Sequence, residues 1–130
     1  MKILIVEDEP TLREGLIDLI RGEGHEVEAV GDGEAAIDRG KQGGFDLVLL
    51  DLMLPKVDGL EVLRRVKSDE STRRTPVVIL TTSSADKDIA QSYEYHANSY
   101  VVKPMDFSKF ESLMDDLGYY WLAWNQNPLR

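Results

Sequence analysis

The chain has 130 residues, no cysteine and a formal net charge of −9, which predicts a single domain without disulfides, zinc–thiolate sites or thiol catalysis. The acidic balance argues against a nucleic-acid-binding surface, which needs clustered lysine and arginine. The apolar run near the start covers only residues 3–6 and no other stretch approaches ~18 apolar residues, so we expect a cytoplasmic protein without signal peptide or membrane span.

The spacing of apolar residues predicts strands that alternate with helices along the chain. In chain order they are a strand over residues 2–7, a helix over 10–22, a strand over 25–30, a helix over 33–40, a strand over 45–50, a helix over 58–66, a strand over 76–80, a helix over 86–95, a strand over 100–102 and a last helix after 106. This alternation implies an α/β fold whose parallel sheet is covered on both faces, because parallel neighbours need crossover connections. The first, third and fourth strands are the most continuously apolar, so we expect them to be central.

Polar residues follow four of the predicted strands at the point where each strand ends. They are Glu7, Asp8 and Glu9 after the first strand, Asp51 after the third, Thr81 and Thr82 after the fourth, and Lys103 after the fifth. Ligands of open parallel sheets gather beyond the carboxyl ends of the strands, so we expect these side chains to converge on one pocket. Neighbouring acids repel one another, and a bound cation would offset that repulsion.

The residue types at this edge suggest metal-assisted phosphoryl chemistry. The carboxylates of Glu7, Asp8 and Asp51 form a hard-oxygen site suited to Mg²⁺. Asp51 stands alone at the end of a buried strand and is the candidate nucleophile, because carboxylates can form aspartyl-phosphate intermediates. Lys103 would supply an ammonium to a phosphoryl oxygen, and the Thr81 hydroxyl would supply a further contact.

Four motifs in this order resemble the receiver domain of two-component response regulators. They are the acidic pair after the first strand, LLDLMLPKVDG after the third, LTTS after the fourth and VVKP after the fifth. The resemblance covers nearly the whole chain and implies a flavodoxin-like, doubly wound, five-stranded sheet of order 2-1-3-4-5 with five helices. It also implies a signalling phosphoacceptor, not an enzyme, which takes a phosphoryl group from the phosphohistidine of a sensor histidine kinase on Asp51.

The resemblance also assigns roles to single residues. It makes Asp8 the main metal ligand, with Glu7 holding the metal or its waters and the backbone carbonyl of Met53 completing the protein ligands. Thr81 and Tyr100 match the switch pair of the family, in which the hydroxyl moves toward the phosphoryl group and the aromatic ring turns inward. The C-terminal half, from LTTSS to VVKPMDF, is similar to stand-alone regulators encoded beside phytochrome-type kinases, so the expected partner is a kinase of that type.

Apolar and aromatic residues after residue 106 predict a long final helix that runs into the low 120s. The whole chain, 1–130, is then one receiver domain with an extended aromatic helix and tail from about residue 118. Both tryptophans, Trp121 and Trp124, lie there, and their rings either fold back on the domain or leave an apolar patch for a partner. We expect a homodimer through the fourth and fifth helices, the strand between them and the C-terminal aromatic tail. The sequence ends at Arg130 without an output domain, so the expected output is protein–protein contact.

Other interpretations stay open from the residues alone. A phosphohydrolase of the haloacid-dehalogenase type needs a second acid two positions after the nucleophile, where this chain has Met53. A flavodoxin-like flavin carrier needs a phosphate loop rich in Ser, Thr and Gly after the first strand, where this chain has acids. Asp8 and Glu9 could merely cap the first helix, and Asp51 could be a turn residue.

Overall fold

The computed structural model describes residues 1–82 and 85–103, in which strands and helices alternate as the sequence predicts. In chain order the elements are β1 (Lys2–Val6), α1 (Pro10–Gly22), β2 (Glu26–Val30), α2 (Gly33–Gly43), β3 (Leu47–Leu50), α3 (Gly59–Ser68), β4 (Val77–Thr81), α4 (Asp86–Glu94) and β5 (Ser99–Val102). The final helix expected after residue 106, with Trp121 and Trp124, lies outside the described residues.

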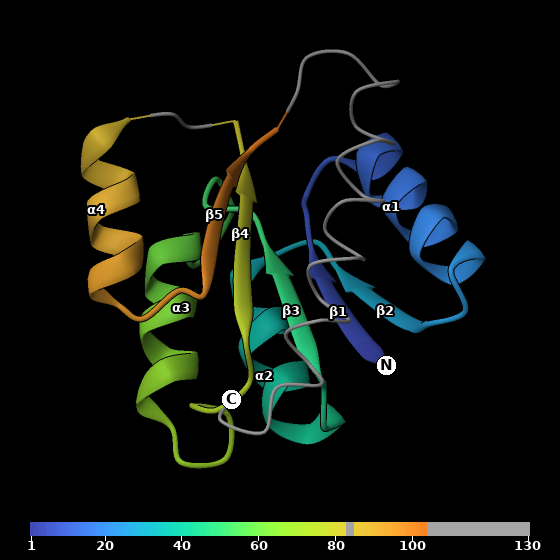
Figure 1. The fold of residues 1–130 in the computed structure, drawn as a ribbon, viewed down its shortest axis with the longest axis horizontal. Coiled ribbons are helices and arrows are strands. Elements are labelled where there is room, and N and C mark those ends of the chain that lie inside the picture. The colour runs from blue at the N-terminus through green and yellow to red at the C-terminus, as the bar shows by residue number, and fades with distance from the viewer. Residues whose placement is uncertain (83–84, 104–130) are drawn as a thin grey trace.

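The five strands form one parallel sheet in the order β2-β1-β3-β4-β5, which confirms the predicted doubly wound topology (Figure 1). The chain leaves β1 toward β2 on one side and continues from β3 toward β5 on the other. The winding direction therefore reverses between β1 and β3, and the carboxyl ends of these two strands flank the switch point. Open sheets of this class bind their ligands at that point.

The sheet supplies most of the core. The central strands β1, β3 and β4 are buried over nearly their whole length, as predicted, whereas β2 at the edge is only half-buried. Alternate residues of β1 point to opposite faces: Leu4 and Val6 pack with buried residues of α2 and α3, and Ile3 and Ile5 pack with α1. This two-sided burial holds the strand ends in fixed positions, which is what a site built from them requires.

Several element boundaries differ from the sequence prediction by one to three residues, and three of these differences have a clear local reason. The third strand begins at Leu47 instead of residue 45, because its pairing with β1 starts at the Ile3–Leu47 register. Thr81 belongs to β4 because it pairs with Val102 of β5. Helix α2 continues past Gly40 and ends where Gly44 adopts a left-handed conformation (φ 62°), which glycine adopts without steric cost.

Side-chain caps fix the starts of the helices that follow the strands. The Glu9 carboxylate accepts the backbone N–H groups of Thr11 and Leu12 and so caps α1, while Asp58 accepts from the Glu61 N–H at the start of α3. Of the two acids that could cap α1 from sequence, Glu9 is therefore the cap. Its neighbour Asp8 forms no hydrogen bond with any described residue.

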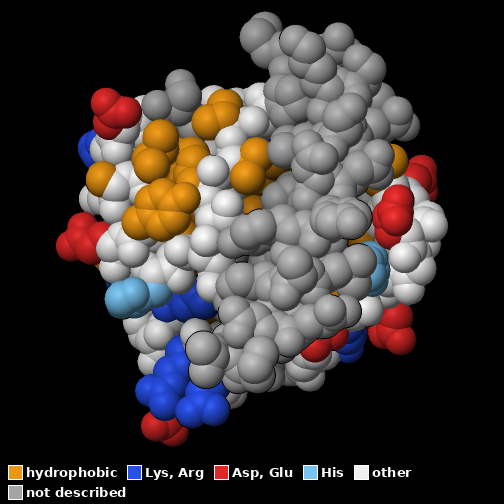
Figure 2. Space-filling view, viewed as in Figure 1, with side chains coloured by type: hydrophobic (Ala, Val, Ile, Leu, Met, Phe, Trp, Pro, Cys, Tyr) orange, Lys and Arg blue, Asp and Glu red, His pale blue; other side chains and the backbone are white. Residues whose placement is uncertain are grey.

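The surface over α4 and β5 carries an apolar patch. Figure 2 shows hydrophobic side chains gathered there, and Tyr93 and Val102 are among the large hydrophobic residues that the described part of the chain exposes. The N-cap residue of helix α4 is Ala85, whose side chain offers no hydrogen bond to the helix. Within residues 1–82 and 85–103, no helix is both long enough and apolar enough to cross a membrane.

Candidate functional site

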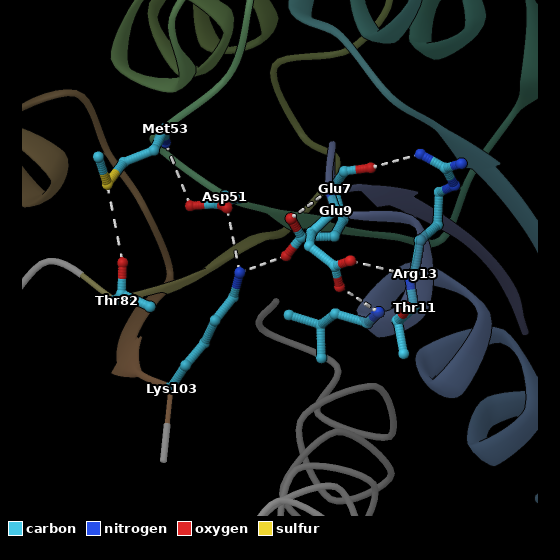
Figure 3. Close-up of polar contacts among 9 residues, drawn as sticks. Glu7, Glu9, Thr11, Arg13, Asp51, Met53, Thr82 and Lys103 are labelled. Atoms are coloured by element: carbon cyan, nitrogen blue, oxygen red, sulfur yellow. Dashed lines mark hydrogen bonds and ion pairs between the residues drawn. The ribbon is translucent and has the colours of Figure 1, made fainter. Parts of the chain in front are cut away.

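The predicted site residues meet at the carboxyl edge of the sheet. Glu7 and Asp51 directly follow β1 and β3, and Lys103 directly follows β5. Backbone hydrogen bonds hold these positions: the Asp51 N–H donates to the Val6 carbonyl at 3.0 Å, and the Lys103 N–H donates to the Thr81 carbonyl at 2.7 Å. The side chains of Glu7, Asp51 and Lys103 turn toward one another (Figure 3).

Lys103 links the two buried acids. Its ammonium donates to Glu7 Oε1 and, at 3.0 Å, to Asp51 Oδ2. The three side chains are almost fully buried, with exposed fractions of 7% for Lys103, 3% for Glu7 and 7% for Asp51. Charge-assisted hydrogen bonds of this kind are the strong ones. One ammonium nevertheless serves two carboxylates, and the buried group keeps an excess of negative charge.

The acids can also hold a cation together. One carboxylate oxygen each from Glu7, Asp8 and Asp51 lies within 4.8 Å of the others, and Asp8 is exposed on the open side of the group. With no other described partner, both Asp8 oxygens remain available to a ligand. Three carboxylates and one ammonium sum to a charge of −2, which a divalent cation that prefers oxygen ligands would balance. The residues present therefore fit such a metal ion.

Burial sets the electrostatics of Glu7. Removal from water raises the pKa of this carboxyl group, and the hydrogen bond and charge of Lys103, together with the Glu9 N–H, offset only part of that effect. The neighbouring charge of Asp51 raises the pKa further. Burial and a like charge both disfavour the ionised form, whereas a bound cation would favour it. The site thus holds its negative charge at a cost that a metal ion would reduce.

The loop after β3 orients Asp51. The Met53 N–H donates to Asp51 Oδ1 at 3.1 Å, so both carboxylate oxygens have a partner. Gly59 begins α3 directly against this loop, and its N–H donates to the Leu52 carbonyl at 2.9 Å. A Cβ atom at Gly59 would come within 2.4 Å of the Asp51 carbonyl oxygen. The lack of a side chain at Gly59 therefore allows the start of α3 to pack directly against the backbone of Asp51.

Two contacts at the site were not evident from the sequence. The Arg13 guanidinium donates to the Glu7 carbonyl at 3.1 Å, although an arginine on a helix usually indicates a solvated position. The close approach of Gly59 was also hidden, since Asp58-Gly59 predicts only a turn and a helix start. One sequence signal could have suggested this close approach. A glycine directly follows the capping Asp58, only a few residues after the candidate nucleophile Asp51.

The remaining predicted residues lie nearby in different environments. Thr81 is fully buried at the end of β4, and Tyr100 of β5 is partly buried against the core. The Met53 side chain is 64% exposed, and its sulfur accepts a hydrogen bond from the Thr82 hydroxyl at 3.7 Å. The structure thus brings Thr81 and Tyr100 onto adjacent strands beside the site, as a switch pair would require, while their movement stays a prediction.

Comparison with known protein families points in one direction. The response regulator receiver domain family matches residues 3–115. A probable methanogenesis regulatory protein, FilR2 of Methanothrix harundinacea, is 45% identical over 108 residues, which cover 78% of this chain and 70% of FilR2. The chain spans about half the length of other curated relatives it matches, with 48% coverage of a staphylococcal response regulator.

Solved structures agree with the family match. The Mn²⁺-bound form of response regulator Rcp1 has a TM-score of 0.86 and 35% identity over 93% of this chain and 94% of that one. The phosphorylated cyanobacterial phytochrome response regulator RcpA has a TM-score of 0.83 and 38% identity over 94% of both chains. A receiver domain of Pseudomonas aeruginosa with a coordinated magnesium ion has a TM-score of 0.76 and 28% identity over 88% of this chain and 94% of that one.

Proposed function

The chain belongs to the response regulator receiver domain family, and from this premise we propose that it accepts a phosphoryl group on Asp51 in two-component signalling. The observation that carries the proposal is the arrangement of charge at the switch point. A buried carboxylate that is held by Lys103 and by the Met53 N–H lies beside two further acids that can bind a divalent cation. A turn residue would need none of these partners.

We propose a role for Asp51 and for the side chains around it. An oxygen of the Asp51 carboxylate attacks phosphorus, the new O–P bond forms, and the bond from phosphorus to the donor breaks, so that the donor leaves with its electron pair. Lys103 contacts both Glu7 and Asp51. We propose that its ammonium then contacts an oxygen of the transferred phosphoryl group and stabilises the negative charge there. The Thr81 hydroxyl would contact another phosphoryl oxygen.

We propose Mg²⁺ as the cation. Its ligands would be Asp8, Asp51 and the Met53 backbone carbonyl, with Glu7 holding the metal or its waters. When bound, the ion would neutralise charge on the incoming phosphoryl group. Solved structures of similar receiver proteins contain Mn²⁺ or Mg²⁺. An all-oxygen ligand set in which the metal keeps several waters favours Mg²⁺.

The donor is proposed to be the phosphohistidine of a sensor histidine kinase. The sequence contains no nucleotide-binding motif, so the phosphoryl group must come from another molecule. The likeness to the cyanobacterial phytochrome response regulator RcpA supports a kinase of the phytochrome type. The kinase would dock near α1, next to the open side of the site where Asp8 is exposed.

Phosphorylation would be transmitted through the α4–β5 face. We propose that Thr81 moves toward the phosphoryl group and that Tyr100 on the neighbouring strand turns inward, which alters the apolar surface around Tyr93 and Val102. A second copy of the chain is the proposed partner for this surface. Light scattering before and after phosphorylation tests it: a monomer under both conditions would contradict the dimer.

Intact-mass spectrometry tests the phosphoacceptor role. With acetyl phosphate and Mg²⁺, the wild-type chain should gain one phosphoryl group, and Asp51→Asn should gain none. Removing Mg²⁺ with a chelator should abolish the gain in the wild type. Uptake by Asp51→Asn equal to that of the wild type would contradict the proposal. Turnover of many equivalents of acetyl phosphate without a stable adduct would indicate a phosphohydrolase instead.

A further inference from the structure

A second pocket lies at the opposite edge of the sheet. Its lining includes Asp46, Pro76 and Asn98, which precede β3, β4 and β5, and it has a cavity volume of about 900 Å³. The α3–β4 connection and the turn between α4 and β5 border it, at the bottom of the sheet in Figure 1. Ligand pockets usually measure ~300–1,000 Å³, so there is room for a small molecule.

The pocket gathers positive charge on a strongly acidic protein. Lys67, Arg73, Arg74 and His96 line it, with Asp46 as its acid. Figure 2 shows Lys and Arg side chains clustered at the lower left, where the α3–β4 connection runs in Figure 1. With His96 neutral, three cations and one carboxylate leave a local charge of +2, in a chain whose formal net charge is −9.

The two arginines of this pocket are available to a ligand. Arg73 and Arg74 are exposed, and the ion pairs of the described residues include neither of them. Another arginine pair shows the contrast: Arg64 and Arg65 of α3 both donate to the carboxylate of Glu61. A guanidinium is a planar fork of donors that matches the oxygens of a phosphate. Two adjacent unpaired guanidinium groups could therefore bind one phosphate group from two sides.

Lys67 adds a partly buried ammonium that has no counter-charge among the described residues. It donates to the Thr75 carbonyl at 2.7 Å and to Asn98 Oδ1 at 3.3 Å, and the Asn98 oxygen also accepts the Val77 N–H at 2.9 Å. All its described partners are neutral oxygens. Burial lowers the pKa of Lys67 to about 8. An anion in the pocket would raise this pKa again, because an opposite charge nearby favours the charged form.

The acid of the pocket does not supply that counter-charge. Asp46 Oδ2 accepts the backbone N–H of Lys2 at 2.8 Å, which ties this carboxylate to β1. No hydrogen bond or ion pair joins it to Lys67 or to the arginines among the described residues. The excess positive charge is therefore left for a ligand.

We propose that this pocket binds the phosphate group of a small phosphate monoester. A monoester dianion matches the local charge of +2, and its oxygens match the forks of Arg73 and Arg74. The open volume beside the arginines would hold the organic part of the ester. The site is separate from Asp51, at the other end of the strands, so the proposal does not depend on the proposed phosphoacceptor role.

Amide NMR titration of the full chain with glycerol phosphate tests the proposal. Ionic strength is held constant with chloride and Mg²⁺ is left out, so that general screening and the carboxyl-edge site do not contribute. The expected shifts centre on Thr75, His96 and Asn98. Replacing Arg73 and Arg74 together by Ala should weaken binding about tenfold or more, since both charge-assisted contacts are lost.

The matched control is the double replacement of Arg64 and Arg65 by Ala. It removes the same two positive charges, but from guanidinium groups already held by Glu61, and should leave the affinity within a factor of about two. Equal loss of affinity in both double variants would show that only net charge matters and would overturn the proposal. Shifts centred on Asp51, or binding of inorganic phosphate without binding of the ester, would overturn it as well.

Discussion

The two edges of the sheet carry opposite charge problems. At the carboxyl edge three carboxylates lie close together, and the ammonium of Lys103 contacts two of them, Glu7 and Asp51. At the amino edge, the ammonium of Lys67 is partly buried among neutral oxygens. Burial raises the pKa of Glu7 at the carboxyl edge and lowers the pKa of Lys67 to about 8 at the amino edge. In both places, burial favours the neutral form of a group that a bound counter-ion would keep charged.

The acidic site at the carboxyl edge and the basic pocket at the amino edge are built from different parts of the fold. The acidic site is built from residues that directly follow strands, so sheet geometry alone brings them together. The basic pocket is built from a helix end and two connections, and its lysine is fixed by loop carbonyl groups. Clusters of ionisable groups with shifted pKa values mark candidate binding sites, and these two clusters predict ligands of opposite sign.

The largest expected effect comes from removing the shared ammonium. Lys103→Ala should slow phosphorylation by acetyl phosphate on the order of 10²-fold, the typical cost of losing one donor to a developing negative charge. Without Mg²⁺ it should also lower the free energy of unfolding by about 3 kcal/mol, because two buried carboxylates lose their cation. Intact-mass time courses and urea unfolding measure the two effects.

The control for that variant is Lys41→Ala, which removes an exposed ammonium paired loosely with Asp69 and should change neither property much. If Lys103→Ala were phosphorylated at the wild-type rate, phosphorylation at the carboxyl edge would not depend on the Lys103 ammonium. That result would contradict the role given to this residue.

A smaller effect separates two neighbouring acids of the carboxyl edge. Asp8→Asn should weaken Mg²⁺ binding about tenfold or more, since affinity follows the number of charged ligands, and should leave stability nearly unchanged because Asp8 has no described hydrogen-bond partner. Glu9→Ala should do the reverse, because Glu9 caps α1. Calorimetric Mg²⁺ titration and urea unfolding of both variants measure this; equal losses of affinity would refute the division of roles.

The capping role also has a pH signature. The N–H groups of Leu12 and Thr11 lower the pKa of Glu9, so its contribution to stability is present above the ordinary pKa of a glutamate and is lost as the pH falls through the lowered value. The stability difference between the wild type and Glu9→Ala should therefore shrink in acid.

The smallest expected effect lies at the amino edge. The pKa of Lys67 is lowered to about 8 in the folded chain, so between pH 8 and the usual lysine value the unfolded chain binds more protons and stability rises with pH. Relative to Lys67→Met, the wild type should gain about 1 kcal/mol over this range, after allowance for solvent screening. A flat difference in urea unfolding between pH 8 and 10 would show that Lys67 is not desolvated.

The pattern of residues was sufficient to predict the strands of the sheet and the residues that meet at its carboxyl edge. Strand periodicity and the position of each acid directly after a strand predicted the convergence of Glu7, Asp8 and Asp51, because parallel strands place their ends at one edge. The strand order needed the family resemblance. Periodicity also predicted the three central strands correctly, since strands buried on both faces are continuously apolar.

Contacts that depend on tertiary packing could not be predicted from the sequence. The charge of Lys67 indicates a solvated helix face, and only the tertiary fold shows that its ammonium is partly buried against the connections that precede β4 and β5. The same holds for Arg13, whose contact with the Glu7 carbonyl depends on how α1 lies on the sheet. Periodicity reports which face of an element is apolar, and it carries no information on which backbone carbonyl a long side chain will reach.

The measurement that tests the central claim most directly is the location of the phosphoryl group. Borohydride reduces an aspartyl phosphate to homoserine, so the chain is treated with acetyl phosphate and Mg²⁺, reduced, digested and sequenced by mass spectrometry. We predict homoserine at position 51 alone, and none when Mg²⁺ is withheld. Reduction at Glu7 or Asp8, or phosphoryl uptake that leaves position 51 unreduced, would contradict the assignment of Asp51 as the phosphoacceptor.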